Sequence, residues 1–236
     1  MQLLVGTSGF SYKEWLGRFY PEKLPAAEML RYYAQHFRTV EINNTFYRMP
    51  AESMLEGWSQ QAPENFTFTL KAPRRITHDK RLREIDSDVA EFARRAGVLG
   101  NKLGVLLFQL PPNLKKDLVR LQNLLSLVPK ERRTALEFRN DSWQDQEVYD
   151  MLRANGAMLC VTDTDEGDTP FVSTSDCGYV RLRRTHYDDA ELGAWAERIA
   201  AQPLVRAYVY FMHEDEALGT RFAAKLNDIW AGRSAA

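Results

Sequence analysis

Short stretches of alternating polar and apolar residues recur along the chain, separated by longer segments whose apolar residues follow helical spacing. Residues 134–139 form the clearest of these stretches. Side chains of a strand alternate between its two faces, so Leu136 and Phe138 share one face and Glu137 and Arg139 share the other. A charged pair is costly to bury unless its members are paired or used. The end of this strand therefore indicates a site.

The order of strand and helix repeats about eight times along the chain. Strands are predicted at 3–5, 39–43, 66–71, 104–109, 134–139, 157–163, 179–183 and 207–211. Helices with an apolar stripe are predicted at 26–36, after Pro50, at 87–98, 114–128 and 147–155, and around Trp195 and Phe222. Ser142 is predicted to cap the helix after the fifth strand, with Asp145 in the capping-box position.

Alternating strands and helices require a parallel sheet with right-handed crossovers. An open doubly wound sheet is one arrangement, but a closed (β/α)8 TIM barrel fits the number of strands better. The connection 164–178 is polar and resembles a loop, so the crossover helix between the sixth and seventh strands is predicted to be missing. We therefore expect a protein of the α/β class that folds as a single TIM-barrel domain over residues 1–236.

Active sites of TIM barrels form at the carboxyl ends of the strands. The polar side chains expected at these ends are Glu41, Asn43, Lys71, Gln109, Glu137, Arg139, Asp163, Arg181, Arg183 and His213. The loops above the strands add further candidates for substrate binding, which are Tyr12, Tyr47, His78 and Trp143. These residues lie far apart in the sequence, and only a closed or strongly twisted parallel sheet would bring them together.

Glu41 and Glu137 are the predicted acid/base pair, and Lys71 completes the predicted catalytic group. Carboxylates about 5 Å apart would suit retaining glycoside chemistry, and a separation of roughly 6.5–9.5 Å would suit inverting chemistry. Lys71, Arg139 and Arg181 would bind an anion. The alternative is a structural ion-pair network that fills the top of the barrel without any ligand, because buried charges must be paired whether or not they react.

The net charge is -1 and the sequence pI is about 6.5, so the whole molecule is not a general binder of polyanions. The loop 72–83 is nevertheless densely basic, since it carries Arg74, Arg75, His78, Lys80, Arg81 and Arg83. A local basic excess on a near-neutral chain favours an anionic partner. We expect an enzyme, either a hydrolase, a lyase or an isomerase, that binds a small anionic or sugar/phosphate-like substrate.

Two other functions remain open. The basic stretch 71–83 lies near Phe46, Tyr47 and Trp143, whose rings could stack on bases, so the chain could bind or process nucleic acid. A TIM barrel could also serve as a platform for protein interactions without any catalysis.

Signals for cofactors and membranes are scarce. The 2 cysteines form no CxxC motif or Cys/His cluster, so we expect no structural metal site, and a divalent ion held by Glu41, Glu137, Asp163 and His213 has little support. No phosphate-binding loop or GxGxxG motif is present, so we expect no nucleotide cofactor. No apolar stretch reaches membrane-spanning length and no signal peptide precedes the first strand, so we expect a cytoplasmic protein without a membrane partner.

Several short motifs follow one another along most of the chain: Gly6-Thr-Ser-Gly9, Phe19-Tyr-Pro21, Val40-Glu-Ile-Asn-Asn-Thr-Phe-Tyr47, Thr77-His78, Gln109-Leu-Pro-Pro112, Glu137-Phe-Arg139 and Tyr208 to Phe211. Their order and number resemble the YecE-like family of TIM-barrel proteins, a domain of unknown function numbered 72. The resemblance runs from Gly6 to about Leu226. It implies a TIM barrel and supplies no established reaction, substrate or catalytic residue.

Overall fold

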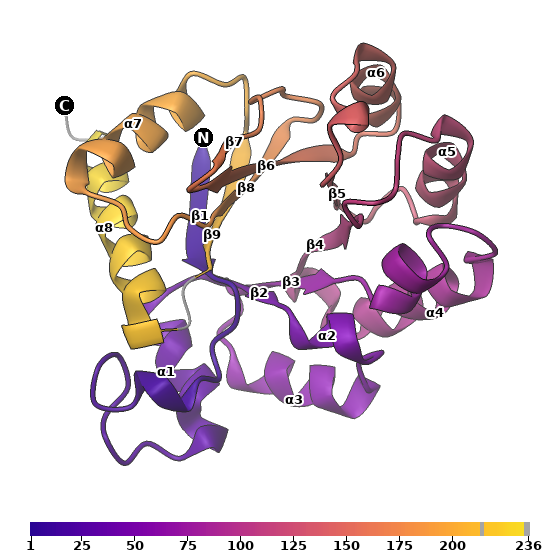
Figure 1. Cartoon of the computed structure of the whole chain (residues 1–236). Coiled ribbons are helices and arrows are strands. Elements are labelled where there is room, and N and C mark those ends of the chain that lie inside the picture. Colours follow the sequence, from indigo (N-terminus) through magenta and orange to yellow (C-terminus); the bar gives the residue numbers. More distant parts are fainter. Residues whose placement is uncertain (213–214, 234–236) are drawn as a thin grey trace.

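Eight parallel strands form a nearly closed barrel in this computed structural model, which describes residues 1–212 and 215–233 (Figure 1). These strands are β1 Gln2–Thr7, β2 Thr39–Ile42, β3 Thr67–Lys71, β4 Leu103–Gln109, β5 Thr134–Glu137, β6 Met158–Thr164, β8 Cys177–Leu182 and β9 Arg206–Phe211. Neighbouring strands follow the order β1-β9-β8-β6-β5-β4-β3-β2. The predicted (β/α)8 TIM barrel is therefore confirmed.

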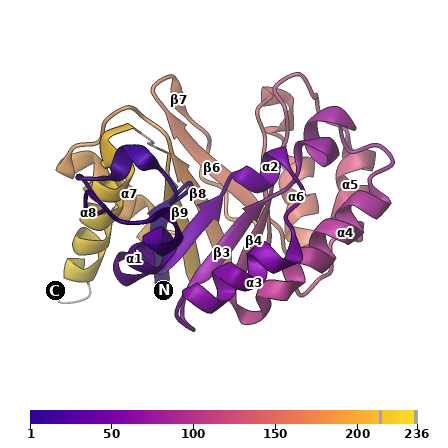
Figure 2. The ribbon, with the colours of Figure 1, turned by 90° about the horizontal axis from the view of Figure 1, so that it is seen from below.

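Helices surround the barrel, as the two perpendicular views show (Figures 1 and 2). The α-helices are α1 Met29–His36, α2 Asn44–Tyr47, α3 Glu52–Gln61, α4 Asp86–Ala96, α5 Leu118–Leu127, α6 Gln146–Ala154, α7 Asp189–Ala200 and α8 Leu218–Arg233. Shorter helical turns lie in the connections, at η1 Lys13–Trp15, η2 Ala26–Glu28, η3 Arg75–Asp79, η4 Gly97–Lys102, η5 Asp141–Trp143 and η6 Asp215–Ala217. None of the helices in the described ranges is long and apolar enough to cross a membrane.

The connection between β6 and β8 contains no helix. The short strand β7, Gly167–Asp168, instead pairs antiparallel with the end of β6. The prediction that this crossover helix is missing is confirmed.

The barrel closes between β1 and β2, where a single bridge at the carboxyl ends replaces a full ladder of hydrogen bonds. Further along this seam, the hydroxyl of Tyr33 accepts a hydrogen bond from the backbone N–H of Thr7 at 2.9 Å and donates one to the carbonyl of Thr39 at 3.1 Å. Gly6 permits this close approach, because a Cβ atom there would lie 2.1 Å from the Thr39 carbonyl oxygen. A side chain of α1 therefore joins the two strands.

The buried apolar side chains of the strands form an inner and an outer core. The inner core fills the barrel and consists of Leu4, Val105, Leu107, Ala135, Met158, Cys160, Cys177, Tyr179, Tyr208 and Tyr210. The outer core packs the strands against the helices and includes Phe68, Leu136 and Val180. The predicted faces of the third, fifth and seventh strands are therefore confirmed, and Lys71 and Glu137 lie on the inner face of their strands.

The chain after β5 differs from its sequence prediction. Asn140 is the N-cap of the turn η5, and its side chain accepts from the backbone N–H of Ser142 at 3.2 Å. Asp145, and not Ser142, is the N-cap of α6. The extra turn lets the ring of Trp143 enter the outer core, where it stacks on Phe138 with 4.7 Å between ring centroids. The predicted cap is therefore wrong, whereas the helix itself begins at Gln146, next to its predicted start at residue 147.

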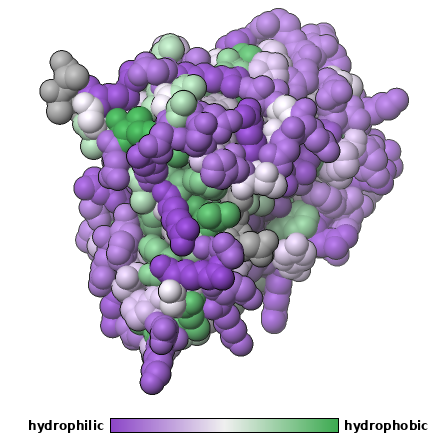
Figure 3. All heavy atoms as spheres, turned by 60° about the vertical axis from the view of Figure 1, so that its left-hand side comes forward, coloured by the Kyte–Doolittle hydropathy of each residue, from purple (hydrophilic) through white to green (hydrophobic). Residues whose placement is uncertain are grey.

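Hydrophilic residues cover most of the face seen in Figure 3, and hydrophobic residues show between them near its middle.

Charged side chains are almost never fully buried unless they are paired, so each one inside the molecule needs a specific explanation. Among the described residues, the buried charged side chains are Glu41, Lys71, Lys102, Glu137, Asp163 and Arg181. All of them except Lys102 lie at or near the carboxyl end of a strand, on the side where the sequence predicts the site.

Candidate functional site

Arg181 lies between two carboxylates inside the top of the barrel. Its Nη2 atom is 2.8 Å from Oε1 of Glu41, and its Nη1 atom donates to Oε2 of Glu137. All three side chains are fully buried. They come from β8, β2 and β5, so the barrel brings together charged strand ends that are far apart in sequence. The sequence predicts this convergence.

Glu41 accepts hydrogen bonds from three different side chains. Besides Arg181, the hydroxyl of Ser8 donates to its Oε1 atom at 2.6 Å, and the hydroxyl of Tyr179 donates to its Oε2 atom. Sequence reasoning missed Ser8 and Tyr179 as partners. Each could have been found from strand alternation, because Ser8 shares the inward phase of Leu4 and Tyr179 lies two residues before Arg181.

Glu137 is surrounded by guanidinium groups. Its Oε1 atom lies 2.7 Å from Nε of Arg139 and 3.9 Å from Nη1 of Arg183. Burial alone would raise the pKa of this carboxyl, but the charges of Arg181, Arg139 and Arg183 lower it to about 2. Glu137 is therefore ionised at neutral pH. Glu41 and Glu137 share one guanidinium and do not form the accessible pair that glycoside chemistry needs.

Lys71, at the end of β3, is a buried cation without an anionic partner. Its side chain is 8% exposed, and its Nζ atom lies 4.2 Å from the ring centre of Phe46. No hydrogen bond or ion pair joins this Nζ atom to another side chain within the described ranges. Burial, and then the charge of Arg181, lower the pKa of Lys71 to about 8 against the opposite effect of Glu137. Lys71 therefore exchanges its proton closer to neutral pH than an ordinary lysine.

Other predicted residues surround this network at the barrel mouth. Gln109 ends β4 in register with Glu137 and is 8% exposed. Arg139 and Arg183 are partly exposed above the buried carboxylates. His78 lies edge-on to Phe46 at 4.9 Å between ring centroids, and burial together with the charge of Lys71 lowers its pKa. The mouth is thus lined by one amide, one imidazole and several cations.

Asp163 lies at the carboxyl end of β6, as predicted, but its side chain does not face the mouth with the other candidates, so its predicted part in substrate binding there is wrong. Its carboxylate accepts from Nε of Arg184 at 2.7 Å, from the hydroxyl of Tyr187 at 3.1 Å and from Nε1 of Trp195 at 3.0 Å. Cys160 belongs to the inner core, and Asp163, three residues later, lies on the opposite face of the strand. Its side chain therefore points toward α7, where Trp195 lies. A strand buried on both faces shows no alternation in sequence, which is why its phase could not be read.

The aromatic residues of the loops also lie apart from the buried network. Trp143 is 1% exposed and its Nε1 atom donates to a backbone carbonyl at 2.7 Å, so the prediction that it contacts a substrate or a base is wrong. Tyr47 is 75% exposed at the end of α2. The hydroxyl of Tyr12 donates to the carbonyl of Ser8 at 2.7 Å. His213 lies outside the described residues.

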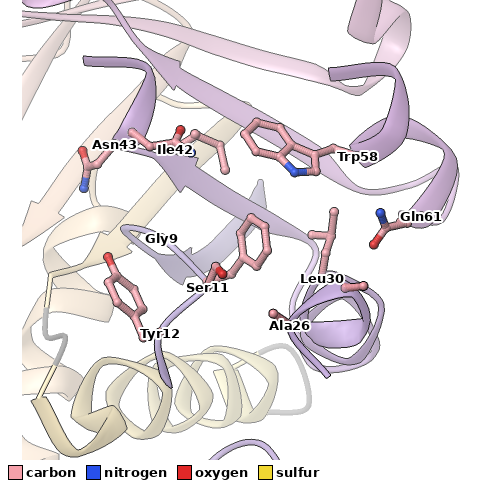
Figure 4. A pocket seen from close by; sticks show the side chains of 12 residues that line it. Gly9, Ser11, Tyr12, Ala26, Leu30, Ile42, Asn43, Trp58 and Gln61 are labelled. Atoms are coloured by element: carbon pink, nitrogen blue, oxygen red, sulfur yellow. The ribbon is translucent and has the colours of Figure 1, made fainter. Parts of the chain in front are cut away.

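A separate cavity of about 320 Å³ lies beside β2 (Figure 4). Leu30, Ile42 and Trp58 contribute apolar side chains to its lining. Tyr12 and Asn43 lie at one side of it, opposite Trp58. The Oδ1 atom of Asn43 is buried without a hydrogen-bond partner in the part of the chain that the structure describes. Asn43 therefore belongs to the lining of this cavity.

Of the residues considered as metal ligands, the three that the structure describes, Glu41, Glu137 and Asp163, do not meet as one set. Within residues 1–212 and 215–233, no group of three or more His, Cys, Asp or Glu side chains is placed to hold a metal ion. Glu41 and Glu137 are joined to Arg181, and Asp163 lies on the other side of the barrel wall.

The basic loop after β3 is partly neutralised by its own neighbours. Arg75 lies 2.8 Å and Lys80 lies 2.7 Å from carboxylate oxygens of Asp88. Arg74 lies 3.2 Å from Asp79. These three bases are therefore less available to an external anion than the sequence suggests.

The rest of this loop lines an open cavity of about 530 Å³, shared with the loop after β4. Arg81, Arg83 and Lys115 face it, and among the described residues none of these three forms an ion pair. Arg81, Leu82 and Glu84 have left-handed backbone angles, with φ of 51°, 62° and 49°. Such conformations are strained for residues other than glycine and cluster at functional sites.

Known proteins resemble this chain over much of its length. A family model described as "Protein of unknown function DUF72" matches residues 4–235. The UPF0759 protein YecE of Escherichia coli strain K12 is 34% identical over 168 residues, which cover 69% of this chain and 59% of that protein. The UPF0759 protein YunF of Bacillus subtilis strain 168 is 31% identical over 185 residues, covering 72% and 64%. The chain thus spans less than two thirds of the length of these relatives.

Solved structures agree with this relationship. The crystal structure of a DUF72 family protein from Thermotoga maritima matches with a TM-score of 0.86 and 27% identity, covering 98% of this chain and 100% of that chain. A DUF72 family protein from Enterococcus faecalis V583 matches with a TM-score of 0.79 and 19% identity, covering 98% of each chain, which supports the fold alone. From its sequence and its fold, the chain belongs to the DUF72 family.

Proposed function

We propose that this protein is an enzyme that binds a small anionic substrate, of the sugar-phosphate or carboxylate kind, at the mouth of the barrel. The reaction would be that of a hydrolase, a lyase or an isomerase. The names of the family and of its relatives state no activity, so the proposal depends on the chemistry of the mouth.

The surplus of positive charge at the mouth is the observation that supports this proposal. Four cationic side chains, those of Arg181, Lys71, Arg139 and Arg183, accompany the two carboxylates of Glu41 and Glu137, which leaves a formal charge of +2 among these described residues. A purely structural network would be expected to balance its charges, because an uncompensated buried charge is unfavourable. A bound anion would supply the missing negative charge.

The buried and accessible groups would then have different roles. Arg181 and the two carboxylates form a rigid base at the top of the barrel interior. Arg139 and Arg183, which are partly exposed, would contact the anionic group of the substrate. Lys71, whose pKa is lowered to about 8, is better suited to proton transfer near neutral pH than Glu137, whose pKa is lowered to about 2.

Thermal unfolding with and without inorganic phosphate tests the binding step. At about 100 times its dissociation constant a ligand stabilises the folded state by about 3 kcal/mol, so we expect phosphate to raise the Tm by roughly 5–10 °C. Arg139→Ala/Arg183→Ala should remove this shift, since both guanidiniums that face the anion are lost.

Arg31→Ala/Arg38→Ala is a matched control that removes the same charge at two exposed positions away from the mouth. This variant should keep the full response to phosphate. An equal loss of response in both variants, or no response in the unmodified protein, would favour the structural ion-pair network instead.

A second function, nucleic-acid binding, is favoured by the cavity of about 530 Å³. Arg81, Arg83 and Lys115 have no ion-pair partner among the described residues and would face backbone phosphates. The ring of Tyr47, in α2 after β2, is exposed and could stack on a base, whereas Trp143 is buried and cannot.

Binding to single- and double-stranded oligonucleotides over a range of salt concentrations tests this second function. We expect Arg81→Ala/Arg83→Ala/Lys115→Ala to weaken binding and to flatten the dependence on salt. The triple variant Lys13→Ala/Lys23→Ala/Arg38→Ala removes the same charge outside the cavity and should bind as the unmodified protein does. Binding that is absent at low salt contradicts the function.

A further inference from the structure

We infer that Lys71 is a nucleophile that forms an imine with an aldehyde or ketone carrying a phosphate or carboxylate group. This inference rests on the proposed function, because it uses the same anion-binding mouth and names the class of substrate. It concerns covalent chemistry, which anion binding alone does not require.

The position of the Lys71 amine favours attack on a bound molecule. The side chain is 8% exposed at the carboxyl end of β3, with Nζ against the ring of Phe46 at 4.2 Å. Within the described residues, no carboxylate lies within ion-pair distance of this nitrogen and no hydrogen bond holds it. An amine held mainly by a ring face keeps its lone pair available once it loses its proton.

Burial favours the neutral form of Lys71 and is the largest effect on its pKa, which falls to about 8. Among the neighbouring charges, Arg181 and Arg139 lower this pKa, while Glu137 and Glu41 raise it. At pH 7 to 8, roughly a tenth to a half of the lysine would therefore be neutral. His78 shares the contact with Phe46 and is itself shifted toward its neutral form.

A second buried lysine shows what a structural lysine looks like in this fold. Lys102 is 7% exposed, yet its Nζ atom donates to the carbonyls of Ser59 at 2.7 Å and Ala62 at 2.8 Å and lies 3.5 Å from Glu64. Its ammonium is fully used in holding the chain. Lys71 has the same burial without such partners, which indicates a chemical role.

The neighbouring guanidiniums determine which carbonyl compounds would bind. Arg139 and Arg183 would hold a phosphate or carboxylate at the mouth, while the carbonyl end of the same molecule reaches Lys71. The neutral nitrogen forms a bond to the carbonyl carbon, and the carbonyl oxygen becomes a hydroxyl. The two protons of the amine then leave with that oxygen as water, and a C=N bond remains. No oxidant or reductant is needed.

Reductive trapping tests this inference directly. The probe is pyridoxal 5′-phosphate, an aldehyde that carries a phosphate, added to the full chain at about pH 7.5 and reduced with borohydride. Peptide mass mapping should find the label mainly on Lys71, and not on Lys102. Pyridoxal without the phosphate should label Lys71 about tenfold less, because the anionic handle is missing.

Two variants separate nucleophilic reactivity from charge. Lys71→Arg keeps the cation and should retain the Tm rise with inorganic phosphate while losing the label. Lys71→Met should lose the label as well, and circular dichroism and thermal unfolding would confirm that it folds. Labelling confined to exposed lysines at a similar rate in all variants would overturn the inference.

The proposed function can be separated from this inference by the same set of measurements. A Tm rise with phosphate but no label on Lys71 leaves the anion-binding enzyme intact and refutes the imine. The absence of both the Tm rise and the label refutes both proposals.

Discussion

Two buried carboxylate clusters lie on opposite sides of the barrel wall, and they are completed in different ways. Inside the barrel, Glu41 and Glu137 hold Arg181, and further cations lie above them. Outside, Asp163 is surrounded by donors from Tyr187 and Trp195 and by one arginine. Among the described residues, the carboxylate of Asp163 in the outer cluster is paired with one guanidinium, whereas the inner cluster has more positive than negative charge.

The difference teaches how to separate a structural charge from a functional one. Burial alone does not do so, since both clusters contain fully buried carboxylates. Charge balance does distinguish the two clusters. Among the described residues, Asp163 is matched by the single guanidinium of Arg184, and its hydrogen bonds join β6 to α7. At the mouth, Lys71 and Arg183 are cations in excess of the two carboxylates. The first arrangement stabilises the fold, and the second suits the binding of an anion.

The largest expected effect comes from removing Arg181. Arg181→Met leaves two buried carboxylates without their shared partner, and breaking a buried pair in this way costs about 3–5 kcal/mol. Urea denaturation at pH 7 measures the loss. The exposed control Arg31→Met should change the free energy of unfolding by less than about 0.5 kcal/mol. A loss below about 1 kcal/mol for Arg181→Met would mean that the inner network is not a structural base.

The next effect is the dependence of stability on pH that comes from Glu137. The pKa of Glu137 is about 2 in the folded state and 4.5 for an unperturbed glutamate, so its stabilising effect is complete above about pH 5 and is lost as the pH falls toward 2. The difference corresponds to about 3 kcal/mol. Urea midpoints between pH 2 and 6 should fall steeply for the unmodified protein and less for Glu137→Gln.

Glu91 provides the control for this titration. Its pKa is also lowered to about 2, by hydrogen bonds from Arg94 and Arg95, but it is fully exposed. Solvent and salt screen such a surface group, so Glu91→Gln should leave the acid dependence nearly unchanged. Equal effects of the two substitutions would show that burial of the inner cluster does not matter for its titration.

The smallest of the three effects is expected at the outer cluster. Asp163→Asn removes a charged acceptor of three hydrogen bonds and should cost about 2 kcal/mol, measured by urea denaturation. It should leave the Tm shift with inorganic phosphate unchanged. The exposed control Asp168→Asn, which breaks only the pair with Arg198, should cost less than about 1 kcal/mol. A lost response to phosphate in Asp163→Asn would place the outer cluster in the site.

The barrel could be predicted from the sequence because alternation in the strands and spacing in the helices are local patterns. The same alternation placed Glu41, Glu137 and Arg181 on inner faces, so their meeting followed from closure of the barrel. Asp163 was misplaced because β6 is apolar on both faces and its phase cannot be read. Strand phase is thus predictable only where one face is polar.

Other features of the site depend on contacts between distant residues. Alternation places Ser8 and Tyr179 on inner faces, but it does not show which side chain their hydroxyls contact, so their hydrogen bonds to Glu41 could not be predicted. Trp143 was expected to be accessible, but the turn η5 inserts it into the outer core. The pairing of Arg75 and Lys80 with Asp88 likewise appears only in three dimensions.

The hydroxyl of Tyr33, which joins the first and second strands, gives the barrel one built-in weak point. Every other pair of neighbouring strands in the wall is joined by a hydrogen-bonded ladder, whereas β1 and β2 are joined by the bridge between Ser8 and Glu41 and by this phenol. A junction with few hydrogen bonds opens at a lower free energy than a full ladder, so the backbone amide of Thr7 should exchange with solvent sooner in Tyr33→Phe than in the parent chain. The same two strands end beside Ser8 and Glu41, so separation of β1 from β2 would also displace the acceptor Glu41 at the charged mouth.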